Sequence, residues 1–105
     1  MTNPWTGEVA LTIDGEQRVL KLTLGSLAQL EEELQTGTMI DLIERFEGGK
    51  ISARDVMALI VAGLRGAGWN GTNADLMAAD IVGGPVKATQ AAGELLRRAF
   101  ALPNA

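Results

Sequence analysis

The stretch "EVALTIDGEQRVLKLTL", residues 8–24, decides the fold class expected for this chain. Polar and apolar residues alternate on both sides of Asp14-Gly15, a dipeptide that favours a two-residue turn because both positions accept positive φ. The turn places six apolar residues on one face of a hairpin: Val9, Leu11, Ile13, Leu20, Leu22 and Leu24. A pair of strands is only marginally stable in water, so we expect helices or another chain to cover this face.

After the hairpin, residues 24–50 have the spacing of two short helices. Thr23 or Ser26 is placed to cap the first helix, and Gly37 is placed to end it. Thr38 is placed to cap the second helix. We expect its apolar face to consist of five residues: Met39, Ile40, Leu42, Ile43 and Phe46.

The second half of the chain predicts three more helices. Ser52 is placed to cap the third, which is apolar around much of its circumference and is therefore expected to be the most buried. Asn73 is expected to cap a short fourth helix. Pro85 suits the start of a last helix, expected over about 86–100. The N–H groups of the first helical turn have no acceptor within the helix, and proline has no N–H to leave unbonded. The expected apolar residues of these last two helices are Leu76, Met77, Ile81, Val86, Leu95 and Leu96.

The fold class that follows is α+β, with an N-terminal β-hairpin at about 7–24 and four or five short α-helices packed on it. The length of 105 residues suits one domain over 1–105. Within it, we expect residues 1–6 to be a flexible lead and residues 103–105 a flexible tail.

Composition argues against several classes of function. The net charge of −4 has the wrong sign for binding nucleic acid, and the aromatic residues that stack on bases are few. With no cysteine and no histidine, a disulfide framework, a thiolate metal site and a hydrolytic triad are excluded. Ser26 and Ser52 are accounted for by helix capping. We therefore expect no catalysis, no cofactor and no metal.

The compartment is expected to be the cytoplasm. No apolar run reaches the roughly 18 residues that span a membrane. No basic region leads into an apolar run, so a signal peptide is not expected. The absence of cysteine fits a reducing compartment.

The stretch "RGAGWNGTN", residues 65–73, matches two motifs by spacing. Gly66, Gly68 and Gly71 have the G-x-G-x-x-G spacing of a dinucleotide-binding loop, and Asn70 begins an N-glycosylation pattern. A dinucleotide loop follows a strand, whereas the preceding segment here is expected to be helical. We interpret the glycines as a connector in which Gly66 and Gly68 let the chain turn. A small ligand-binding domain that uses this loop is a remote alternative.

One group of carboxylates has a spacing that could suit a cation. Asp41, Glu44 and Glu47 share one face of the expected second helix and could bind a cation. With no histidine among them and an apolar face opposite, a solvated helix face is the favoured interpretation.

Three aromatic residues are candidates for binding a partner. Trp5 lies in the expected lead, Trp69 in the glycine stretch and Phe100 near the end of the last helix. A tryptophan in a polar loop either folds back onto the core or binds a partner, and folding back is the favoured interpretation for Trp69.

Four segments in order carry a family resemblance: "GEVALTIDG", "LKLTLGSLAQLEEEL", "LIERFEGGKISARDVMALIVAGLRGAG" and "GGPVKATQAAGELLRRAFAL". Their most specific part is the succession RFEGG, SARDV, AGLRG and LLRRAF. The chain resembles, from Gly7 to about Leu102, the tail-assembly-chaperone-like family of gene transfer agents and tailed phages of alphaproteobacteria. This family is also described as a gene transfer agent tail tube protein.

The resemblance implies a non-enzymatic role in building a phage-type tail. The first and favoured form of this role is a chaperone that binds the tape-measure protein, since a small acidic helical domain suits transient binding of amphipathic helices and two strands supply little sheet for a tube subunit. Its second form is a structural subunit of the tail tube. Other tail proteins, and further copies of the chain, are the expected partners, because a hairpin leaves strand edges open.

Overall fold

The computed structural model describes residues 8–33 and 39–100, and of Glu33, Met39 and Phe100 it describes the backbone alone. It contains an N-terminal hairpin, β1 (Val9–Ile13) and β2 (Glu16–Leu20), followed by five helices. The helices are α1 (Leu24–Glu33), α2 (Met39–Glu47), α3 (Ala53–Gly66), α4 (Asn73–Met77) and α5 (Gly84–Phe100). The α+β class expected from the sequence is confirmed. The expected lead, tail, Gly37 and Thr38 lie outside the described residues.

The hairpin has the expected turn and register. Asp14 and Gly15 both have positive φ, 52° and 79°, as the two-residue turn requires. Val9 therefore pairs with Leu20, and Ile13 pairs with Glu16. The apolar face of the hairpin is buried at Val9, Leu11, Ile13 and Leu20.

The second strand ends earlier than expected, and Leu24 is not on the sheet. The Lys21 N–H donates to the Gly63 carbonyl of α3 at 2.9 Å. Thr23 then caps α1, because its Oγ1 accepts from the Ser26 N–H at 3.1 Å while the Ser26 Oγ accepts from the Thr23 N–H at 2.7 Å. The chain thus enters α1 at Leu24, whose side chain is 85% exposed.

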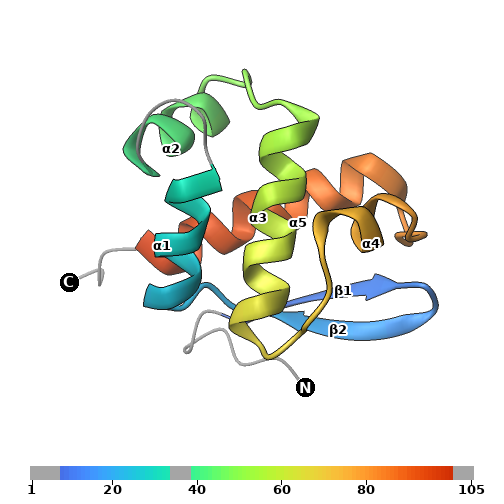
Figure 1. The fold of residues 1–105 in the computed structure, drawn as a ribbon. Coiled ribbons are helices and arrows are strands. Elements are labelled where there is room, and N and C mark those ends of the chain that lie inside the picture. Colours follow the sequence, from blue (N-terminus) through green and yellow to red (C-terminus); the bar gives the residue numbers. More distant parts are fainter. Residues whose placement is uncertain (1–7, 34–38, 101–105) are drawn as a thin grey trace.

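Helix α3 is the centre of the fold (Figure 1). It contacts β2, α1, α4 and α5, and eight of its residues are buried, as expected. Figure 1 shows α1 and α2 on one side of α3 and α4 on the other, with the hairpin below. Buried residues of both strands and all five helices form one hydrophobic core.

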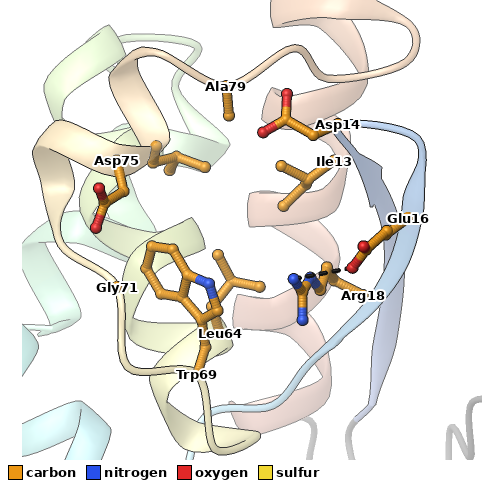
Figure 2. Close-up of a pocket in the computed structure, with 10 residues that line it drawn as sticks. Ile13, Asp14, Glu16, Arg18, Leu64, Trp69, Gly71, Asp75 and Ala79 are labelled. Carbon is orange, nitrogen blue, oxygen red and sulfur yellow. Dashed lines mark ion pairs between the residues drawn. The ribbon is translucent and has the colours of Figure 1, made fainter.

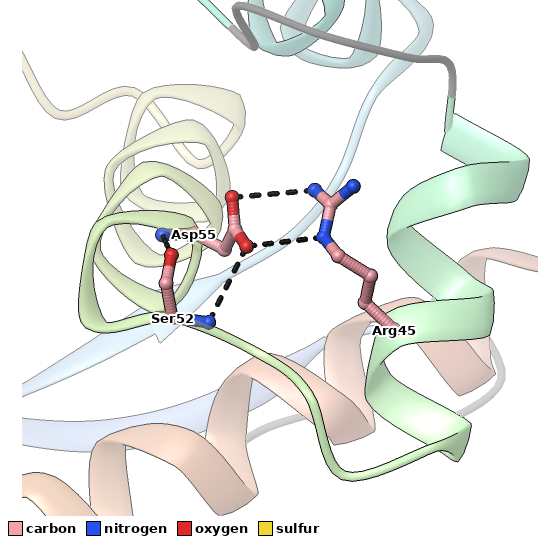
Figure 3. Close-up of polar contacts among 3 residues, drawn as sticks. All are labelled: Arg45, Ser52 and Asp55. Atoms are coloured by element: carbon pink, nitrogen blue, oxygen red, sulfur yellow. Dashed lines mark hydrogen bonds and ion pairs between the residues drawn. The ribbon is translucent and has the colours of Figure 1, made fainter.

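The start of α3 is fixed by a capping box that also holds α2. The Ser52 Oγ accepts from the Asp55 N–H at 3.1 Å, and the Asp55 carboxylate accepts from the Ser52 N–H at 3.4 Å. Arg45 of α2 donates to both oxygens of the same carboxylate, each at 3.3 Å (Figure 3). The expected cap at Ser52 is confirmed, and Asp55 joins two helices.

Helix α4 differs from expectation at both ends. Thr72, not Asn73, is its cap, and Asp75 completes a second capping box. Ile81 lies outside the helix and instead forms a bridge with Ile13 of β1. The Val82 N–H donates to the Thr12 carbonyl and the Asp14 N–H to the Asp80 carbonyl, at 3.1 and 2.8 Å. The segment after α4 therefore covers part of the outer edge of β1.

Several residues expected on apolar helix faces are exposed. Ile40 is 66% exposed, although Leu42 of the same helix is fully buried. Met77 and Val86 are 72% and 69% exposed. A helix that packs on the core along a narrow stripe leaves its flanking apolar positions in solvent. Within the described ranges, no helix is both long enough and apolar enough to cross a membrane.

Candidate functional site: the Trp69 pocket and the α3–α5 groove

The loop after α3 turns back on the helix that precedes it. The N–H groups of Ala67 and Gly68 donate to carbonyls of the last turn of α3, and Gly68 has a φ of 102°. The Trp69 N–H then donates to the Leu64 carbonyl at 2.9 Å. Gly68 thus has the turning role expected for it, because positive φ is strained for other residues.

Gly66 has a different role from the expected one. It is the last residue of α3, and it is not among the residues with positive φ. A Cβ placed on it would lie 1.9 Å from the Lys21 carbonyl oxygen. Glycine is needed here because the backbone leaving β2 passes directly against α3.

Trp69 folds back, as the favoured interpretation predicted. Its indole is half-buried and packs against the hydrophobic core. It lies so close to the chain at Gly71 that a Cβ there would be 2.0 Å from the ring. Arg65 fastens the same loop, because its guanidinium donates to the Gly71 carbonyl at 3.4 Å. Two of the three motif glycines are therefore explained by close packing and one by its φ.

The indole forms one wall of a pocket of about 330 Å³, called here the Trp69 pocket. Figure 2 shows it between the tip of the hairpin and the loop that leads into α4. The pocket is lined by Ile13, Asp14, Glu16, Arg18, Leu64, Trp69, Gly71, Asp75, Leu76 and Ala79.

The carboxylates around the Trp69 pocket take part in structural interactions. Asp14 accepts from the Asp80 N–H at 2.8 Å, and Asp75 accepts from the Thr72 N–H at 2.8 Å. Glu16 pairs with Arg18 at 3.0 Å. Within residues 8–33 and 39–100, the acidic side chains form no group of three that could hold a metal ion. The pocket offers an indole face and paired charges.

The other two predicted partner-binding residues have no described side chain. Trp5 lies outside the described residues, and of Phe100 the structure describes the backbone alone. Nor does the glycine loop have the setting of a nucleotide site. It follows helix α3, whereas a dinucleotide fingerprint follows a strand.

A second concave surface, called here the α3–α5 groove, encloses about 480 Å³. It is lined by Ile51, Ser52, Ala53, Val56, Met57, Ile60, Leu76, Met77, Ile81, Pro85, Ala88 and Thr89. None of these side chains is charged. Sequence reasoning missed this groove because its residues come from three helices and the loops before them. The one sequence signal was the surplus of apolar positions in short helices, at Met77 above all.

The carboxyl group of Glu94 has a perturbed pKa. Arg97 and Arg98, one turn further along α5, hold the pKa of Glu94 below its ordinary value, chiefly through the hydrogen bond from Arg97. Arg98 also donates to the Glu8 carbonyl beside β1. This cluster ties the end of α5 to the start of the hairpin and lies apart from both concave surfaces.

Taken together, the fold and its surfaces define a small α+β domain with an apolar groove and a packed tryptophan loop. The family model described as "Phage tail tube protein, GTA-gp10" matches residues 6–102. The chain therefore belongs to this phage tail tube family, which is related to gene transfer agents. The resemblance expected from the sequence is confirmed at the level of the family.

Two further comparisons gave no match. Neither the curated proteins nor the solved structures contain a protein that matches this chain. The description of the family names a tail tube protein, which agrees with the structural role expected as the alternative better than with the favoured chaperone role.

Proposed function

We propose that this protein is a non-catalytic structural component of a phage-type tail tube. The observation that carries the proposal is the family match over residues 6–102, nearly the whole chain. Its partners are other tail proteins and further copies of itself. The α3–α5 groove supports this role, because an exposed apolar groove marks a surface that binds another protein.

Quantitative mass spectrometry of purified particles tests the proposal. A tube subunit is expected in every particle, in a fixed ratio to the other tail proteins. A structural role would be contradicted if the protein were abundant in the producing cells but missing from washed, finished particles.

A second candidate function is a tail-assembly chaperone that binds the tape-measure protein. Two observations favour it. The described residues hold a sheet of only two strands, which is little for a subunit of a sheet-lined tube. The uncharged groove suits the apolar stripe of an amphipathic helix.

Co-expression with the tape-measure protein tests the chaperone role. A soluble complex that survives size exclusion at micromolar concentration, together with absence from finished particles, is the expected result. Separate elution of the two proteins would contradict it. In either role we expect the protein to act in the cytoplasm, where phage-type tails are assembled.

A further inference from the structure

We propose that the α3–α5 groove binds helix α2 of a second copy of this chain, so that copies associate head to tail. This inference deepens the tail-tube role proposed above and rests on it, because a tube is built from repeated subunits. Three features of the described residues support it: the apolar groove, the charges beside it and the outer face of α2.

The groove is lined mainly by apolar side chains, with Ser52 and Thr89 as its two hydroxyl groups. Val56, Ile60 and Leu76 form buried or nearly buried parts of its wall, and Met57 adds a flexible thioether side chain. Met77 stands at its edge and is 72% exposed. Methionine side chains adapt to different apolar shapes, which suits a surface that receives a partner.

Three exposed basic residues adjoin the groove on its α3 and α5 sides. Lys50 precedes the lining residue Ile51, Arg54 follows Ala53, and Lys87 precedes Ala88; all three cations are exposed. Asp55, the acidic residue on the α3 side, is already paired with Arg45. Asp75 and Asp80 adjoin the groove only on its α4 side. An occupant with acidic groups around an apolar centre is therefore favoured by charge.

The outer face of α2 has that composition. Ile40 is 66% exposed, and Glu44 and Glu47 follow it at the spacing that keeps residues on one helix face. The face thus presents the apolar side chain of Ile40 beside the exposed carboxylates of Glu44 and Glu47. It is complementary to an apolar groove flanked by Lys50, Arg54 and Lys87.

The two surfaces lie on different sides of the molecule. Figure 1 shows α2 on one side of α3, and α4, which borders the groove, on the other. A contact between two different surfaces is heterologous, so each added copy leaves one α2 and one groove unoccupied. Such contacts close into rings or continue as open helical assemblies, which are the two geometries from which a tube is made.

Sedimentation velocity of the purified full-length protein tests the proposal. Because the contact is small, we expect association to develop with concentration between about 5 and about 500 μM. Ile40→Asp and Met77→Asp are each expected to weaken it by at least about tenfold, since each introduces a carboxylate into an apolar contact. Leu24→Asp is the matched control, because Leu24 is 85% exposed and belongs to neither surface.

Mixing the two variants tests the head-to-tail geometry. The Ile40→Asp protein keeps its groove, and the Met77→Asp protein keeps its α2 face. Each is expected to be mainly monomeric alone at concentrations where the wild type associates, whereas an equimolar mixture forms a dimer that does not grow further. The double reversal Glu44→Lys/Glu47→Lys should weaken association of the otherwise unchanged chain, and adding Lys50→Glu/Arg54→Glu should restore part of it.

Three results would overturn the inference. They are a wild-type chain that stays monomeric up to about 500 μM, an association that neither single variant weakens, and a mixture that remains monomeric. The first would mean that the groove takes a segment of another protein or none. These outcomes are distinct from failure of the proposed function, because the presence of the chain in finished particles is measured separately.

Discussion

Replacing Gly66 by alanine tests the packing at the centre of this fold. The added Cβ would lie 1.9 Å from the Lys21 carbonyl oxygen and 3.0 Å from its carbon. Both atoms belong to the backbone, so the clash cannot be relieved by rotating a side chain. Either α3 or the segment that leaves β2 must move.

The loss in the free energy of unfolding can be estimated from the interactions that this movement changes. Overpacking a close contact costs about 1–3 kcal/mol. The shift also weakens the 2.9 Å hydrogen bond from the Lys21 N–H to the Gly63 carbonyl, which contributes about 1 kcal/mol. The higher helix propensity of alanine stabilises the variant by up to about 1 kcal/mol and offsets part of this loss. We expect a net loss of about 2 kcal/mol, or a Tm lower by about 8–15 °C for a domain of this size.

Urea unfolding followed by circular dichroism at 222 nm measures this loss. Gly25→Ala is the matched control, because Gly25 also lies in a terminal turn of a helix and a Cβ added there would come no closer than 4.0 Å to its nearest neighbour, the Thr23 Oγ1. The control is expected to be as stable as the wild type or slightly more stable. If Gly66→Ala matched the control, β2 and α3 would not approach each other as closely as this packing requires.

Other contacts give three more predictions. Gly71→Ala, made in a Trp5→Phe background, should push the Trp69 indole outward and shift its fluorescence to longer wavelength, because the new Cβ would lie 2.0 Å from the ring; unchanged emission would refute this packing. Ser52→Ala should lower the free energy of unfolding by about 1 kcal/mol in a urea titration, through loss of the α3 cap; a change below the error of the fit would show that the cap is not needed. The pKa of Glu94 is lowered in the folded protein, so its stabilisation is complete above the ordinary pKa of 4.5 and is lost as the pH falls through the folded value. Glu94→Gln should therefore be less stable than the wild type at pH 7, with the gap in Tm closing as the pH drops below 4.5, and a gap independent of pH would contradict the assignment.

Much of the fold could be predicted from the sequence, because interactions between residues close along the chain specify it. The Asp14-Gly15 turn sets the register of the hairpin, because only a few residue pairs adopt positive φ at both positions. Ser52 and Asp55 mark the start of α3 through a box whose two hydrogen bonds span three residues. Such signals act over a few positions along the chain, so the sequence displays them directly.

The cap of α4 was misplaced by one residue, but two other incorrect predictions arose where a distant segment binds the same backbone groups. Leu24 was expected on the sheet, but Gly63 accepts the hydrogen bond of Lys21 and the chain turns into α1 instead. Ile81 was expected in α4, but it forms a β-bridge with Ile13 at the edge of β1 instead. In both cases a partner more than forty residues away along the chain decided the local structure.

The two concave surfaces show the same division between sequence and tertiary structure. From the sequence, Trp69 could be recognised as a residue that either packs or binds, and the structure places its indole over Gly71 and against the core. No single sequence motif predicted the α3–α5 groove, because residues from three helices form it only after the helices pack together. Sequence by itself determined the turn and register of the hairpin, the cap of α3 and the succession of helices, all of which depend mainly on neighbours within a few residues. Tertiary structure alone decided which apolar side chains stay exposed, because exposure depends on which segments cover one another in space.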